Sequence, residues 1–230
     1  ADELFPLTEA TIRGLHHELL RYYPQASHHA GGYKTTPNRV VAINHETGKE
    51  RVVLDPFPPG IITITAMAEL INWYNAIIRD YPWPMLVATE FTFRFLAIHP
   101  FQDGNGRLGR ALFILALFHS GDKYLTSITP YIAIDRHIEQ SRALYYTVLH
   151  QCSEGKFQSG PTQYNLEPLA WFFINILEVS LADIELYRKR YANLQKPTDT
   201  AFAVLNRFKS SPEKRLKGGD IFYTPGPRRR

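Results

Sequence analysis

Apolar side chains recur at helical spacing along most of the chain, and this periodicity constrains the fold more than any other feature. A first helix is expected from about Thr8 to Tyr23, with Thr8 as its cap. Its apolar face holds Ile12, Leu15 and Leu19. The same spacing predicts further helices from Thr63 onward and over about residues 85–98, 107–121, 135–155 and 166–194.

One segment breaks the helical pattern. The short β-branched runs at 39–43 and 50–54 are joined by the turn-rich NHETGK, which predicts a β-hairpin, and DPFPPG at 55–60 ends its second strand. Two strands alone are marginal in water, so the hairpin must pack on helices. We therefore expect an all-α fold, a helical bundle with a small β-hairpin. The compact domain should cover residues 1–195, because KPTDT at 196–200 breaks the pattern.

Composition excludes several classes. With 44% apolar and 13% aromatic residues in 230, the chain can bury a core without disulfides or a metal, and it is neither disordered nor collagen-like. Cys152 is the single cysteine, which rules out an intrachain disulfide and favours a reducing compartment. The start resembles no signal peptide, and the longest apolar run, Ala111–Phe118, is too short to span a membrane. We expect a cytoplasmic location. Because residue 1 is Ala, the chain is either processed or a fragment.

Positive charge is concentrated near the C-terminus. The net charge is +4, yet residues 186–230 carry 12 Lys or Arg against three Asp or Glu. Residues 196–230 form a basic tail or the remnant of a following region. Such a tail is ordinarily a solvated terminus, although binding to nucleic acid stays open.

The segment HPFQDGNGRLGR at 99–110 gathers chemically active groups between two predicted helices. A glycine-rich turn before a helix presents unpaired backbone N–H groups, which attract phosphates. Arg107 and Arg110 project from one side of the first helical turn, where only a polyanion would make two guanidinium groups favourable. Asp103 could share a hard cation such as Mg²⁺ with phosphates. His99 can exchange a proton near neutral pH. These residues predict a site for displacement at a nucleotide phosphate.

This segment resembles the motif HPFx(D/E)GNGRxxR of the Fic (filamentation induced by cAMP) family. Its nine fixed positions match His99, Pro100, Phe101, Asp103, Gly104, Asn105, Gly106, Arg107 and Arg110. The likeness covers about residues 8–190. The hairpin with DPFPPG corresponds to the flap that guides the target side chain, and RALYYTVLHQCSEG at 142–155 resembles the helix that closes the adenine pocket.

The resemblance implies a Fic-type helical bundle that transfers AMP from ATP to a Ser, Thr or Tyr hydroxyl of a target protein. His99 would be the general base and Asp103 the Mg²⁺ ligand. The phosphates would be held by Asp103, Gly104, Asn105, Gly106, Arg107, Leu108, Gly109 and Arg110, with Arg107 near the β-phosphate and Arg110 near the γ-phosphate. The flap edge would be Val53, Leu54, Asp55 and Pro56, and the adenine would meet Tyr145, Tyr146 and Ser153.

Departures from the family pattern affect the adenine pocket and regulation. Ser153 and Ser141 stand where relatives often have Asn, so the pocket could accept another nucleotide. Gly106 favours AMP transfer, since a Lys there accompanies γ-phosphate transfer in the Doc branch. Residues 1–230 lack the inhibitory pattern (S/T)xxxE(G/N), whose Glu pairs with the arginine at 110 in self-inhibited relatives. An inhibitory helix would come from a missing segment or a partner antitoxin; otherwise this form is constitutively active.

Alternative functions remain open. The same site could remove AMP or transfer phosphate, and the domain could be part of a nucleotide-sensing or DNA-associated regulator. The pairs His16-His17 and His28-His29 are expected at the surface, because adjacent helical residues face different ways. Cys152 is expected to be an inert packed thiol. The stripe Trp171, Phe172, Ile174 and Leu177 should pack the core, with homodimerisation as its other use.

Overall fold

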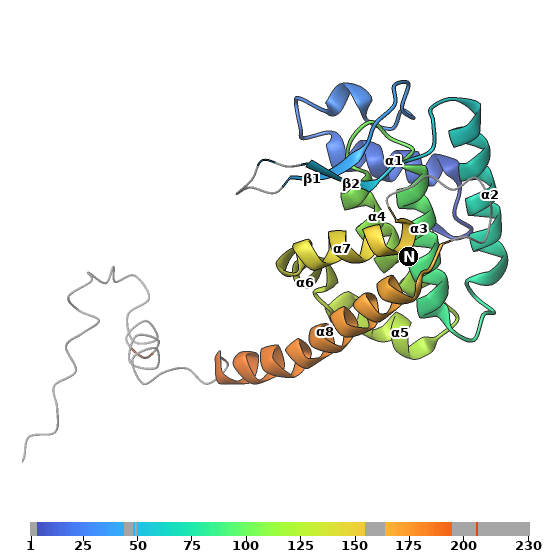
Figure 1. Cartoon of the computed structure of the whole chain (residues 1–230). Helices are drawn as coiled ribbons and strands as arrows, with labels where there is room; N and C mark the ends of the chain where they lie inside the picture. The colour runs from blue at the N-terminus through green and yellow to red at the C-terminus, as the bar shows by residue number, and fades with distance from the viewer. Residues whose placement is uncertain (1–3, 44–47, 49, 155–163, 195–205, 207–230) are drawn as a thin grey trace, which may run out of the picture. The chain divides into compact units, whose positions relative to one another are not determined.

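The computed structural model describes residues 4–43, 48, 50–154, 164–194 and 206 (Figure 1). Helices dominate this part of the chain, and its one sheet has two strands. The prediction of an all-α fold with a small hairpin is confirmed. The elements are α1 (Glu9–Leu20), β1 (Val40–Ile43), β2 (Glu50–Leu54), α2 (Ile61–Ile77), α3 (Pro84–Ile98), α4 (Asn105–His119), α5 (Lys123–Ile128), α6 (Ile134–Gln140), α7 (Arg142–Ser153) and α8 (Glu167–Leu194), with short 3-10 turns at Ser27–His29 and Thr129–Tyr131.

The core is built around α3, which is apolar on nearly every side. Its buried residues include Phe91, Phe93 and Phe95, so the helix is surrounded by other elements. It packs against α2 and α4. At Gly109 of α4, an added Cβ would lie 3.0 Å from the Leu96 side chain, so the missing side chain lets α3 and α4 approach closely. The loop between these two helices is therefore held at both ends by the core.

The predicted start of the first helix is confirmed. Thr8 is the N-cap of α1, and its hydroxyl accepts a hydrogen bond of 3.0 Å from the Thr11 N–H. This helix packs against α2 and α4. It therefore lies beside the loop that precedes α4.

The hairpin is confirmed as an antiparallel pair. Val40 pairs with Leu54 and Ile43 with Glu50, with a bulge between Val40 and Val41. The hairpin leans on a helix as expected, because α7 packs against β2.

The structure differs from the predictions in three respects. The helix expected over 135–155 is two helices, α6 and α7, which meet at Ser141. Asp135 is not a cap but lies in the first turn of α6, after Ala133 as N-cap. The short α5 was not predicted, although Asp122 caps it by accepting from the N–H groups of Tyr124 and Leu125.

The chain divides into the units Ala1–Ala182 and Asp183–Arg230. The predicted boundary at 195 and the basic region 196–230 lie outside the described residues, apart from Asn206. In the first unit, Phe172 of α8 is buried as expected, whereas Trp171 and Ile174 are exposed, so that stripe only partly packs the core. No helix over the described residues combines the length and apolar character that a membrane span needs.

Candidate active site

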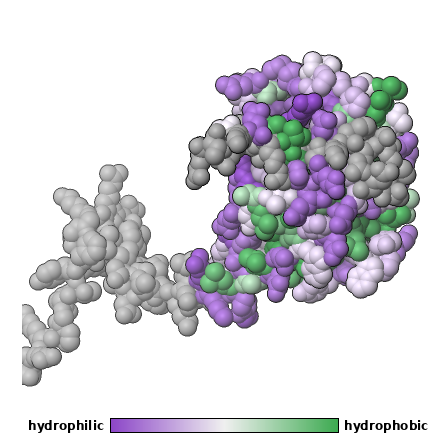
Figure 2. Space-filling view, viewed as in Figure 1, coloured by the Kyte–Doolittle hydropathy of each residue, from purple (hydrophilic) through white to green (hydrophobic). Residues whose placement is uncertain are grey.

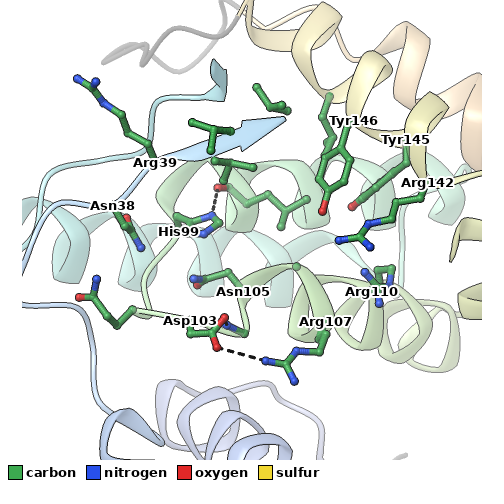
Figure 3. Close-up of a pocket in the computed structure, with 18 of the residues that line it drawn as sticks. Asn38, Arg39, His99, Asp103, Asn105, Arg107, Arg110, Arg142, Tyr145 and Tyr146 are labelled. Atoms are coloured by element: carbon green, nitrogen blue, oxygen red, sulfur yellow. Dashed lines mark hydrogen bonds and ion pairs between the residues drawn. The ribbon is translucent and has the colours of Figure 1, made fainter. Parts of the chain in front are cut away.

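A cavity of about 540 Å³ opens between the hairpin, the loop between α3 and α4, and α7 (Figure 3). Its size is typical of a small-molecule site. Ten of the predicted site residues line it: Val53, His99, Asp103, Gly104, Asn105, Gly106, Arg107, Arg110, Tyr145 and Tyr146. Segments that are distant in the sequence thus meet around one space.

His99 ends α3 and forms part of the cavity wall. Its backbone is left-handed (φ 50°, ψ 58°), a conformation that few residues other than glycine adopt. Nδ1 lies 3.2 Å from the carbonyl oxygen of Leu96. Since a carbonyl oxygen only accepts, Nδ1 carries the proton and Nε2 keeps its lone pair. The imidazole can therefore take up a proton at Nε2.

Burial lowers the pKa of His99 to about 4, and the positive charge of Lys34 acts in the same direction. The hydrogen bond to the Leu96 carbonyl and the charge of Asp103 oppose this shift but do not overcome it. At neutral pH the imidazole is uncharged. It is thus in the form that a general base requires.

Asn105 ties together the loop that follows His99. Its Oδ1 accepts from the Phe101 N–H at 2.9 Å, and its Nδ2 donates to the Phe101 carbonyl at 2.7 Å. The residue is buried, and these bonds use its side-chain amide to hold the loop, whereas the resemblance placed Asn105 among the residues that hold the phosphates. Gly104 precedes α4 with φ 78°, which turns the chain into the helix. The first N–H groups of α4, at Asn105, Gly106 and Arg107, lack partners within the helix and border the cavity.

His16 supports the same loop from below, which corrects the expectation that it is a surface histidine. It is fully buried and stacks on Phe101 with 3.7 Å between ring centroids. Nδ1 accepts from the Gly31 N–H, and Nε2 donates to the Asp103 carbonyl, each at 2.9 Å. Burial lowers its pKa, which preserves this neutral form. Nothing in the local sequence distinguishes His16 from the adjacent His17, which is exposed.

Both arginines of the motif are held by carboxylates. Arg107 lies 3.4 Å from Asp103 and also over the ring of Tyr23. Arg110 forms an ion pair with Asp135, through its Nε at 2.5 Å. Two further cations, Arg39 and Arg142, were missed by the sequence analysis, and both line the cavity (Figure 3). The lining therefore holds four guanidinium groups and two carboxylates, those of Asp103 and Glu139, so its net charge is positive.

Aromatic and apolar side chains also line the cavity. Tyr145 and Tyr146 of α7 project toward it from one side (Figure 3). The hydroxyl of Tyr145 is buried and has no hydrogen-bond partner among the described residues. Burial raises the pKa of Tyr145, so this hydroxyl stays protonated and can donate to a ligand. The remaining apolar lining comes from Val40, Val41, Val53, Leu96 and Leu149.

Several predicted site residues lie outside the lining. Leu108 is buried in the core, and Gly109 contacts Leu96. Ser153 is buried, with its hydroxyl donating to the Leu149 carbonyl at 3.3 Å. Asp55 pairs with Arg39 at 3.4 Å. Pro56 is buried, and the side chain of Leu54 is outside the described residues.

Other lining residues were not predicted. Asn38 and Gln102 contribute amides, and Glu139 a carboxylate. Gln102 occupies the variable position of the motif. Asn38 precedes the hairpin in a segment without regular pattern, so only the three-dimensional packing reveals it.

Residues 6–117 match the model of the Fic/DOC family. The chain is 33% identical over 91 residues to a Fido domain-containing protein of Dictyostelium discoideum, covering 35% of this chain and 60% of the relative. It is 30% identical over 122 residues to a protein adenylyltransferase Fic of Culex quinquefasciatus, covering 50% of this chain and 22% of the relative. The matches thus span less than two thirds of each relative.

Solved structures support the fold. A Fic family protein from Desulfovibrio desulfuricans superimposes with a TM-score of 0.60 at 21% identity, over 96% of this chain and 57% of the other. A Fic domain containing signaling protein from Bacteroides thetaiotaomicron gives 0.53 at 28% identity, over 80% and 62%. Caenorhabditis elegans Fic-1 gives 0.54 at 19% identity, over 84% and 46%.

Proposed function

Because this chain is a Fic domain protein, we propose that it is a protein adenylyltransferase, which transfers AMP from ATP to a Ser, Thr or Tyr hydroxyl of a target protein. One observation carries this proposal: a neutral histidine and an arginine-lined helix N-terminus face the same cavity. The lining arginines suit a triphosphate, and the lining tyrosines suit a nucleobase. The relative named as a protein adenylyltransferase supports the same activity.

In the proposed reaction, Nε2 of His99 removes the proton from the acceptor hydroxyl. The hydroxyl oxygen then forms a bond to the α-phosphorus, the bond from that phosphorus to the bridging oxygen breaks, and pyrophosphate leaves. Negative charge grows on the phosphate oxygens and the leaving group, where Arg107, Arg110 and the N–H groups of α4 stabilise it.

The residues present fit Mg²⁺. Asp103 offers an exposed carboxylate beside the N-terminus of α4. The described residues contain no cluster of three or more His, Cys, Asp or Glu that could hold a metal alone. Mg²⁺ commonly binds through one carboxylate together with water and substrate phosphates, which matches this donor set. Bound there, the ion would neutralise phosphate charge.

Labelled ATP tests the proposal. The full chain is incubated with Mg²⁺ and ATP labelled at the α- or the γ-phosphate, with self-modification as the first readout. Label on protein from the α-position alone is expected. Label from the γ-position alone would show phosphate transfer instead. Absence of ATP binding in calorimetry would refute the nucleotide site itself.

Two variants assign the base. His99→Ala should lose at least about 100-fold in transfer rate, since general base catalysis contributes this much, while ATP binding persists. His17→Ala is the matched control, because this histidine is exposed on α1. Equal rates in His99→Ala and the unmodified chain would remove His99 from the mechanism.

A further inference from the structure

Lys34 is a buried lysine beside the proposed active site. Only 3% of its surface is exposed to solvent. The ammonium donates to the Ile98 carbonyl and to Oδ1 of Asn38, each at 3.1 Å. Among the described residues, Lys34 forms no ion pair with a carboxylate. Burial without a counter-charge is unfavourable for an ammonium group, so other contacts must offset the lost hydration.

The position of the ammonium group provides part of the compensation. Ile98 is the last residue of α3, where the helix carries partial negative charge and carbonyls lack helical partners. The cation therefore caps the C-terminal end of α3. Burial lowers the pKa of Lys34 to about 8, so the group remains mostly charged at pH 7.

The segment around Lys34 also binds Pro100 and Phe101, the two residues that follow His99. Its backbone N–H donates to the Pro100 carbonyl at 2.8 Å, and its neighbour Tyr33 forms a β-bridge with Phe101. Asn38, held by the ammonium group, donates to the Phe101 carbonyl at 2.9 Å. The left-handed backbone of His99 lies between Ile98 and Pro100, whose carbonyls both accept hydrogen bonds from Lys34. Such a conformation persists where its surroundings hold it.

Charge provides a second link between the two residues. The charged groups that act on His99 are Lys34, from the segment before β1, and Asp103, from the loop before α4. Lys34 disfavours the imidazolium, and Asp103 favours it. Without Lys34, the imidazole would feel only the carboxylate and would protonate more readily.

We infer that Lys34 is a positioning residue for His99: its ammonium group holds the turn that carries the histidine, and its positive charge adds to the effect of burial in disfavouring the imidazolium. The catalytic consequence rests on the proposed function, because it takes His99 as the base. The effect on protonation does not.

A titration of His99 by NMR tests the inference without any activity. The imidazole signals are followed from about pH 2.5 to 8 in the unmodified full chain, Lys34→Met and Lys34→Gln. Removing the charge should raise the pKa of His99 by roughly 0.5–1 in both variants. Lys123→Met, at an exposed lysine, should leave it unchanged. An unchanged titration in a folded Lys34 variant would overturn the inference.

Rates form the second readout. Lys34→Met should lower kcat for transfer at least about tenfold while the KM for ATP stays within twofold, since the phosphate-binding residues are untouched. A pure stability role would move neither the rate of the folded fraction nor the titration. Failure of the unmodified chain to transfer AMP would refute the proposed function and leave the titration result standing.

A measurement on the unmodified chain covers the case in which both variants fail to fold. Nitrogen-detected spectra of the lysine side chains should show one ammonium group with slow hydrogen exchange and close contacts to Asn38. If every lysine exchanges like a surface group, the inference fails.

Discussion

At the scale of single residues, the site depends on two histidines kept neutral by burial. His99 presents a lone pair to the cavity, whereas His16 uses both ring nitrogens to hold the loop. The same physical cause, desolvation, lowers both pKa values. Their different roles follow from what each nitrogen contacts, a property that residue type alone does not convey.

The lowered pKa of His99 predicts a pH-dependent stability. Its folded pKa of about 4 lies below the ordinary histidine pKa of 6.5, so the unfolded chain binds more protons between these values. Its contribution is complete above about pH 6.5 and is lost as the pH falls toward 4. Between pH 7 and pH 5, the free energy of unfolding should therefore fall by roughly 1–2 kcal/mol more in the unmodified chain than in His99→Gln. Urea unfolding at the two pH values measures this, and equal losses in both proteins would contradict it.

At the scale of elements, the α3–loop–α4 unit combines a packed helix pair with an irregular loop. Helical spacing predicted α3 and α4 because their burial pattern is regular. The break at Ser141 was missed because the predicted helix 135–155 contains neither proline nor an internal glycine. The motif located the loop, but its support by His16 and Asn38 depends on contacts between residues more than 60 positions apart.

Two glycines of different environment test the rigidity of this loop. Gly104 has φ 78°, and an added Cβ would lie 3.2 Å from Nε2 of His16, so Gly104→Ala should destabilise the fold by about 1–2 kcal/mol. Gly14, inside α1, has nothing within 4 Å of its Cβ position, so Gly14→Ala should stabilise it by about 0.5–1 kcal/mol. Thermal unfolding of both variants provides the comparison. A neutral Gly104→Ala would mean that the turn tolerates a side chain.

At the scale of the whole molecule, sequence patterns predict the architecture better than they predict which residues line the cavity. The motif at 99–110 supplies eight of the lining residues. Arg39 directly precedes β1 and Arg142 begins α7. The family resemblance places both segments at the site, but it singles out neither arginine as a lining residue. Conversely, Leu108 and Gly109 belong to the motif but face the core, because neighbouring residues of a helix point to different sides of its axis. A contiguous sequence motif therefore suggests more ligand contacts than a helix can make, because some of its residues face the core.

The residues that line the cavity and the basic C-terminal region occupy different parts of the sequence. All lining residues lie between Asn38 and Leu149, whereas residues 186–230 carry 12 Lys or Arg. Removal of residues 196–230 should therefore leave the melting temperature within about 2 °C and the Kd for ATP within about twofold, because no lining residue is lost. Scanning calorimetry and titration calorimetry measure the two quantities. If the basic region binds nucleic acid, the full chain alone should bind DNA with an affinity that falls steeply with salt. A large loss of ATP affinity on truncation would instead place part of the nucleotide site in the C-terminal region.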